Sequence, residues 1–262
     1  MAGESGTVDP MHQFMVEPLF GESWMIGGQS IAFTNSALWM AFTLVAVWLF
    51  MLGGMKRELV PGRWQMAVES VTGAISGLVD QSIGPKGRSF LPYIFTLFMF
   101  ILVANLLGML PTALGGLHAF TLTSHLTVTG VLALLSFAIV LVVGFWKHGL
   151  RFFSLFIPAG VPWYMAAFLF PIELISFLMR PFSLGLRLFV AMTAGHILMK
   201  VLAGFVISGI NLESALLSPI IVLPSFALMI GITLLELLVC AIQAYVFALL
   251  TSVYLNDAVN LH

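Results

Sequence analysis

The sequence predicts an all-α polytopic membrane protein, and three observations lead to this fold class. Of the 262 residues, 60% are hydrophobic and 8% are charged, whereas roughly a quarter of the residues in soluble domains are charged. The mean hydropathy of +1.09 leaves too little polar surface to cover a water-facing globule. The apolar residues also form blocks of about 20 or more, the length with which a helix crosses the hydrocarbon core. We expect spanning helices, one amphipathic surface helix and a C-terminal hairpin of two long tilted helices.

Residues 1–35 form an acidic N-terminal segment that contains no Lys or Arg. The segment lacks the positive region of a signal peptide and the arginine-rich face of a transit peptide, so we expect no cleaved leader. Residues 36–55 are the first predicted spanning helix. It stops at the charged sequence Lys56-Arg57-Glu58, which is typical of the end of a span.

Residues 62–84 have a different pattern, which predicts an amphipathic helix. Apolar side chains recur on one face at helical spacing, at Trp64, Val68, Val71, Ile75 and Val79. We interpret this segment as a helix that lies on the membrane surface. The alternative is a helix whose apolar face packs against its neighbours.

The rest of the chain is predicted to cross the membrane four times. Residues 90–146 hold two spanning helices, the first of which contains Asn105. Residues 163–256 hold two apolar stretches, each about twice as long as a crossing requires. These stretches must be tilted, kinked or divided, and prolines supply places to bend, namely Pro171, Pro181, Pro219 and Pro224.

The positive charges predict the orientation of the helices. They cluster in the two connections that share a side if each of the first three spans crosses once, at Lys56, Arg57, Arg63, Lys86, Arg88, Lys147 and Arg151. Because positive connections stay in the cytoplasm, residues 1–35 are predicted outside and the C-terminus inside.

Most ionisable residues within apolar segments lie in the last two stretches, as Glu173, Arg180, Arg187, His196, Lys200 and Glu236. Each charge costs about 2.5 to 3.5 kcal/mol at a helix centre, so such residues are expected to face protein or water and to be functional. Arg187 lies deep in its segment and stays protonated at physiological pH. The alternative for Arg187 is a structural ion pair with Glu173.

If the last two stretches form an antiparallel hairpin, residues at one depth have numbers with a nearly constant sum. This register pairs His196 with Glu236 near the outer side, Arg187 with Gln243 at the centre, and Glu173 with Asp257 near the inner side. It predicts an outer pair of proton-exchanging groups, a central cation beside an amide, and an inner pair of carboxylates.

The chemistry of these residues fits protons better than metal ions. A sodium or calcium site needs several converging oxygen ligands, while a histidine titrates near neutral pH. The single cysteine, Cys240, excludes a disulfide framework and a thiolate metal cluster, and it is interpreted as a small buried apolar residue. The net charge of -1 provides no basic face for nucleic acid. We expect no metal and no cofactor.

Several motifs together resemble subunit a of the F-type ATP synthases, in its mitochondrial and alpha-proteobacterial form. They are Ser183-Leu184-Gly185-Leu186-Arg187-Leu188-Phe189, Thr193-Ala194-Gly195-His196, Glu236, Ile242-Gln243-Ala244-Tyr245-Val246-Phe247, Tyr254-Leu255, and Asn105-Leu106-Leu107 with Leu110-Pro111. The resemblance implies a proton-translocating stator subunit with no catalytic site of its own. It further implies two offset half-channels, and contacts with a ring of c subunits, with peripheral-stalk b subunits and with membrane lipid.

The resemblance also implies roles for individual residues. Arg187 would be the essential arginine that faces the ring carboxylate, His196 and Glu236 the outer access pair, and Gln243 the amide near the arginine. The predicted proton pathway further includes Glu173 and Asn105, with Arg180, Lys200 and Asp257 as additional members. The chain departs from the family at Val190-Ala191, where Gly-Asn is common.

Two other classes of function are considered. A secondary transporter would have an internal repeat with interrupted helices in both halves, and none is found in the sequence. A purely structural anchor would leave Arg187, His196 and Glu236 without a reason to lie in the membrane. The predicted location is the inner membrane of a bacterium or, for an organelle-encoded chain, of a mitochondrion.

Overall fold

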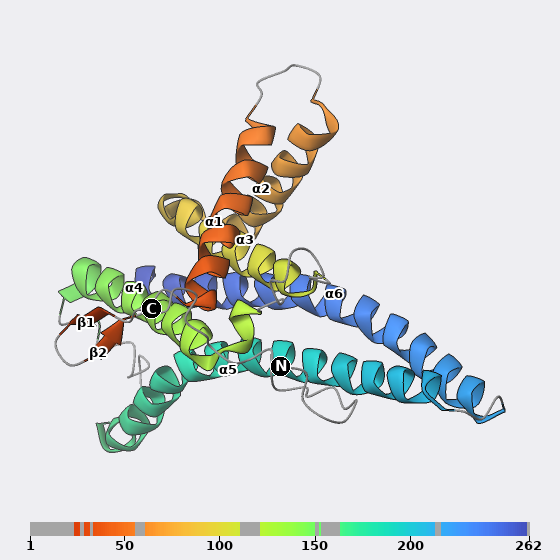
Figure 1. Ribbon diagram of the computed structural model, residues 1–262. Helices are drawn as coiled ribbons and strands as arrows, with labels where there is room; N and C mark the ends of the chain where they lie inside the picture. The colour runs from red at the N-terminus through yellow and green to blue at the C-terminus, as the bar shows by residue number, and fades with distance from the viewer. Residues whose placement is uncertain are drawn as a thin grey trace.

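The computed structural model describes residues 24–26, 29–31, 34–55, 61–110, 121–149, 152, 163–212 and 216–260, and most of them are helical. The α-helices are α1 (Asn35–Gly54), α2 (Arg63–Ser82), α3 (Leu91–Gly108), α4 (Leu126–His148), α5 (Trp163–Ile210) and α6 (Leu217–Val259). Two short 3-10 helices, η2 (Pro85–Phe90) and η3 (Leu122–Ser124), precede α3 and α4. Strands β1 (Trp24–Ile26) and β2 (Gln29–Ile31) pair as a small antiparallel ribbon (Figure 1).

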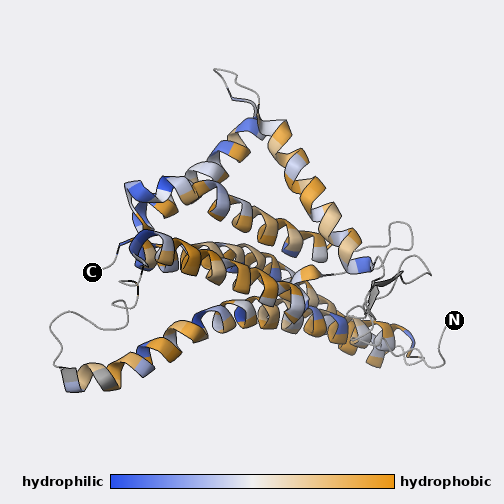
Figure 2. Ribbon diagram, turned by 90° about the vertical axis from the view of Figure 1, so that its left-hand side faces the viewer, coloured by the Kyte–Doolittle hydropathy of each residue, from blue (hydrophilic) through white to orange (hydrophobic). Residues whose placement is uncertain are grey.

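Among the described residues, five helical segments are long and apolar enough to cross a membrane. They are α1, η2 together with α3, α4, α5 and α6. Apolar residues predominate along these helices (Figure 2), because no water is present in the bilayer to compensate for exposed polar groups. The predicted fold class, an all-α polytopic membrane protein, is confirmed.

Helices α5 and α6 run side by side and antiparallel along most of their length (Figure 1). They contain 48 and 43 residues, and each forms one helix rather than two. The first part of α5, which contains Pro171 and Pro181, turns away from the line of the rest of the helix (Figure 1). Proline lacks the backbone N–H and crowds the preceding turn, which accounts for the bend.

Helix α2 packs against the other helices through its apolar face. Val68 contacts Gly54 at the end of α1, and Ile75 and Val79 join a buried cluster to which α3, α4 and α6 also contribute. The Trp64 indole Nε1–H donates to the Phe50 carbonyl at 3.0 Å. The alternative interpretation, a helix packed on its neighbours, therefore describes α2, and its position at the membrane surface stays a prediction.

One end of the bundle brings together η2 and the ends of α4 and α6. The Lys86 Nζ donates to the Asn260 side chain at 3.2 Å, and the His148 ring lies 3.3 Å from the Val259 carbonyl. These contacts agree with the predicted topology, in which the three segments share a side. We refer to this end as the inner end and to the opposite end of α4 as the outer end.

Candidate functional site

The most buried ionisable contact in the described structure joins α5 to α6. The His196 Nδ1 lies 2.8 Å from the Glu236 Oε1, and the two side chains are only 4% and 2% exposed. The predicted pairing of these residues across the hairpin is thereby confirmed. A pair of this kind can pass a proton between an imidazole and a carboxylate, because each group exists in two protonation states.

Gly195 makes room for this pair. A Cβ atom at position 195 would lie 2.7 Å from the Glu236 Oε1 and 2.9 Å from its carboxyl carbon. The absence of a side chain lets the carboxylate lie directly against α5, beside His196. The structure therefore explains the glycine at position 195, which the sequence motif alone does not.

Helix α3 contributes Asn105 to the same region. The fully buried Asn105 side chain donates through Nδ2 to the Cys240 carbonyl at 3.3 Å. Cys240 lies one helical turn after Glu236, so Asn105 is brought close to the outer pair. The Cys240 sulfur contacts the sulfur atoms of Met109 at 3.3 Å and Met192 at 3.9 Å, in agreement with a buried apolar environment.

Arg187 differs from the outer pair in that it is exposed. Its neighbours Leu184 and Leu188 are buried against the bundle, while the Arg187 side chain is exposed. Within the described residues Arg187 forms no ion pair or hydrogen bond, neither with Glu173 nor with Gln243. The alternative of a structural pair with Glu173 is therefore wrong. Glu173 is exposed on α5, and Gln243 is half-buried on α6.

The inner contact between α5 and α6 involves Arg180 rather than Glu173. The Arg180 Nη1 donates to the Asp257 Oδ2 at 2.7 Å, with side chains 28% and 30% exposed. The guanidinium also lies over the rings of Phe177 and Tyr254, at 5.2 and 4.9 Å from their centroids.

The predicted pairing of Glu173 with Asp257 is wrong for two physical reasons. The register assumed two straight helices, whereas the first part of α5 turns away from the line of the rest of the helix (Figure 1). Two carboxylates also repel each other, while Arg180 and Asp257 attract. Lys200 follows His196 by one turn on α5, and its side chain is half-buried.

Helix η3 contacts α5 about one turn before His196, and the motifs of the sequence predict no role for it. Thr123 and Ser124 are buried, and the Thr193 hydroxyl of α5 donates to the Ser124 carbonyl at 3.4 Å. Burial also lowers the pKa of His125, which precedes α4. The only signal in the sequence was the cluster Thr121-Leu122-Thr123-Ser124-His125 between two apolar blocks.

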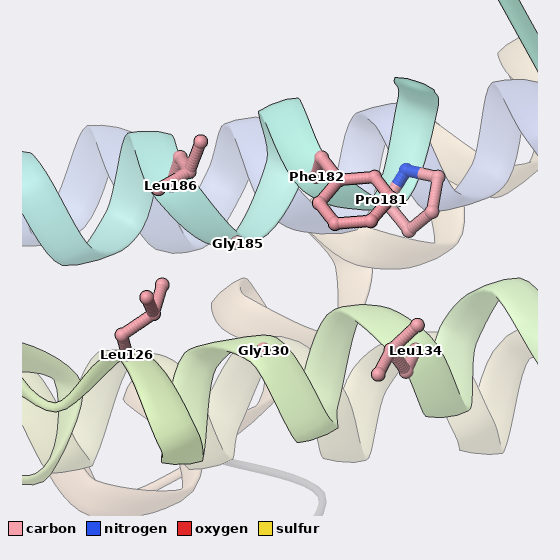
Figure 3. A pocket seen from close by; sticks show the side chains of 7 residues that line it. All are labelled: Leu126, Gly130, Leu134, Pro181, Phe182, Gly185 and Leu186. Atoms are coloured by element: carbon pink, nitrogen blue, oxygen red, sulfur yellow. The ribbon is translucent and has the colours of Figure 1, made fainter. Parts of the chain in front are cut away.

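A cavity of about 210 Å³ between α4 and α5 has a different character. It is lined by Leu126, Gly130, Leu134, Pro181, Phe182, Gly185 and Leu186 (Figure 3). Arg187 follows this lining in sequence, but the lining side chains are all apolar. Since they offer nothing to bind water or a proton, we do not assign the proton path to this cavity.

Comparison with known proteins identifies the family. A profile of the ATP synthase A chain family matches residues 36–256. The chain belongs to this family. A protein named ATP synthase subunit a from Rhizorhabdus wittichii is 71% identical over the full length of both chains. Its namesake from Sphingopyxis alaskensis is 65% identical over both full lengths.

A more distant relative is also similar over nearly the full length of both chains. The ATP synthase subunit a of Rhodospirillum rubrum is 44% identical over 97% of this chain and 99% of its own. The predicted function, a proton-translocating stator subunit of an ATP synthase with no catalytic site of its own, is confirmed by these matches. A secondary transporter is not favoured.

Proposed function

We propose that Arg187 separates two proton half-channels and forces a carboxylate on a ring of c subunits to release its proton. The observation that carries this proposal is the exposure of Arg187. It is a permanent cation at an exposed position of a membrane-spanning helix, without an ion-pair partner among the described residues. A charge in that position is costly in lipid, so a partner of opposite charge outside the chain is expected.

The physical argument follows from the charge of arginine. An opposite charge within about 4 to 6 Å favours the ionised form of a carboxylate, and at about 4 Å the attraction is on the order of 4 kcal/mol near a protein surface. A protonated ring carboxylate that approaches Arg187 therefore loses its proton. Because the guanidinium cannot deprotonate, it cannot itself conduct protons from one half-channel to the other.

The buried pair forms the outer access route in this proposal. His196 and Glu236 exchange protons, and Asn105 supports them from α3. Gln243 lies on the α6 side of the central region. Glu173, two helical turns before Arg180 on α5, serves the inner half-channel, and Lys200 lies beyond His196 toward the outer end. The outer pair is buried and Arg187 is exposed at a different depth of α5. This offset favours a path in which a proton passes from the outer pair to the ring carboxylate before that carboxylate meets Arg187.

The assembly and location follow from the same reasoning. The exposed face of α5 is proposed to contact the c ring, and peripheral-stalk b subunits are proposed to hold the chain as part of the stator. The relatives described above are bacterial, which favours the bacterial inner membrane. Lipid covers the remaining apolar surface.

Replacement of Arg187 by Ala tests the proposal. We expect ATP synthesis driven by a proton gradient to be lost in inverted membranes, while the subunit stays inserted. Arg187→Lys is not expected to restore the activity, since lysine can deprotonate when desolvated and lacks the planar fork. ATP synthesis at the wild-type rate in Arg187→Ala membranes would contradict the assignment.

A cysteine pair tests the contact with the ring. Val190 is exposed one turn after Arg187, whereas Leu188 is buried within the bundle. Val190→Cys should cross-link to cysteines placed beside the ring carboxylate, and Leu188→Cys is the matched control that should not. Cross-linking of Leu188→Cys but not of Val190→Cys would place the ring on another face of the chain.

A further inference from the structure

Four elements of the structure form a closed ring of contacts at the outer pair, and we call the region inside this ring the enclosure. One contact closes each side of this enclosure. The contacts are Thr121 Oγ1 with the Gly108 carbonyl at 3.5 Å, Asn105 Nδ2 with the Cys240 carbonyl at 3.3 Å, His196 with Glu236 at 2.8 Å, and Thr193 Oγ1 with the Ser124 carbonyl at 3.4 Å. They join the η3 segment to α3, α3 to α6, α6 to α5, and α5 back to the η3 segment.

The contacts on each helix lie about one turn apart. Asn105 precedes Gly108 by three residues on α3, and Thr193 precedes His196 by three on α5. Side chains three or four residues apart share a helix face. One face of α3 therefore takes part in two successive contacts, and so does one face of α5. The four contacts link the elements into a ring rather than a row.

Buried polar atoms from all four elements lack a hydrogen-bond partner in the described protein. They are Thr123 Oγ1 from η3, Asn105 Oδ1 from α3, His196 Nε2 from α5, and Glu236 Oε2 from α6. Buried polar groups in proteins are normally hydrogen-bonded to protein or to ordered water. Four such groups around one enclosure provide the two to four partners that a buried water requires.

We propose that the η3 segment is a wall of the outer half-channel and that Thr123 holds ordered water which passes protons to His196. This inference rests on the proposed function of the His196–Glu236 pair. A hydroxyl both donates and accepts, so Thr123 can bind water in either orientation of a hydrogen-bonded chain. Each hop moves one proton from a hydronium to the next water. The last hop protonates His196 at Nε2, and the Nδ1 proton passes to Glu236.

The chain offers a matched pair of threonines to test this role. Thr123 and Thr129 are both fully buried, but the Thr129 hydroxyl bonds to the carbonyls of His125 and Leu126 at 3.3 and 3.4 Å. We expect Thr123→Val to slow passive proton flux through the assembled membrane sector severalfold. Thr123→Ser should retain the flux because it keeps the hydroxyl, and Thr129→Val should conduct as the wild type does.

The outcomes separate this inference from the function on which it rests. Wild-type flux in Thr123→Val, with flux lost in His196→Ala, would overturn the role of Thr123 and leave the outer pair in place. Wild-type flux in His196→Ala would instead overturn the proposed function. A dependence of the flux on sodium rather than on pH would assign the enclosure to a metal cation and would also overturn the water chain.

A second variant covers the case in which Thr123→Val fails to assemble. Thr123→Cys is made in a Cys240→Ala background, because Cys240 is the native cysteine beside the enclosure. Silver ions, which follow water and bind thiolates, should block proton flux in this variant and not in Cys240→Ala alone. Equal resistance of both variants to silver would show that water does not reach position 123, and would overturn the inference.

Discussion

The two charged contacts between α5 and α6 lie in contrasting surroundings. At the outer end, His196 and Glu236 are almost fully buried, beside polar atoms that lack protein partners. At the inner end, Arg180 and Asp257 are each about 30% exposed, and the guanidinium stacks on Phe177 and Tyr254. The outer contact joins an imidazole and a carboxylate, which can each gain or lose a proton, whereas the inner contact contains an arginine that stays charged. We infer that the outer contact moves protons and that the inner one holds the helices together.

The energetic consequences of the two surroundings also differ. Removal of one member of a buried ion pair costs about 3 to 5 kcal/mol, because the other charge stays buried without a partner. The Arg180–Asp257 pair is half-buried, and water still reaches and screens its charges, so we expect it to contribute about 0 to 1 kcal/mol, the range of exposed pairs. Changes at the outer end should therefore have larger effects than changes at the inner end.

The largest effect is expected from changes to the outer pair itself. His196→Ala or Glu236→Gln should slow ATP-driven proton pumping in inverted vesicles by about 100-fold, a typical contribution of a positioned acid or base. The exchange of both residues, His196→Glu with Glu236→His, retains one acid and one imidazole and should pump faster than either His196→Glu or Glu236→His alone. Additive losses would show that the two groups do not share a network.

A smaller loss is expected when the outer pair is displaced rather than removed. In Gly195→Ala the new methyl group would overlap the Glu236 carboxylate, so either the carboxylate or the helix must shift. Pumping should fall severalfold, since small displacements of catalytic groups reduce rates. Gly204→Ala is the control, because a Cβ atom at that position of α5 meets no neighbour within 4 Å. Equal pumping by both variants would remove the proposed reason for a glycine at position 195.

The contrast between the two ends also explains which contacts could be predicted from the sequence. The hairpin register placed His196 beside Glu236 because both residues lie where α5 and α6 run straight alongside each other. The same register failed for Asp257, because the start of α5 bends and a constant offset no longer applies. Periodicity reports which residues share a face of one helix, but not how two bent helices meet.

Other features depend on neighbours that are distant in the sequence. The place of Thr123 in the enclosure arises from contacts of η3 with α3 and α5, which no local pattern encodes. The apolar face of α2 was predicted from its helical spacing, but that spacing fits a membrane surface as well as a helix bundle. The contact of Val68 with Gly54 shows that this face packs on a neighbouring helix.

At the inner end, changes to Arg180 and Asp257 should affect stability more than proton transfer. Asp257→Asn should lower the free energy of unfolding by about 1 kcal/mol or less, as for an exposed pair. Arg180→Gln should cost somewhat more, because stacking of a guanidinium on aromatic rings adds about 0.5 to 1 kcal/mol. Thermal unfolding of the purified complex, compared for the wild type, each single variant and the double variant, would measure the coupling between Arg180 and Asp257. A loss of pumping in Asp257→Asn as large as in Glu236→Gln would contradict the division between the two ends.

The smallest expected effect concerns His125, at the outer end of α4. Burial lowers the pKa of His125 below its ordinary value of 6.5, so the folded protein binds fewer protons at this site than the unfolded chain does. Stability therefore rises with pH through the interval between the lowered pKa and 6.5, and it falls as the solution is acidified through the same interval. His125→Gln removes the titrating group and should make the unfolding temperature of the complex less sensitive to pH below 6.5. The comparison is the difference in unfolding temperature between mildly alkaline and mildly acidic buffer, for the wild type and the variant. An undiminished difference in the variant would show that protonation of other groups accounts for the acid sensitivity.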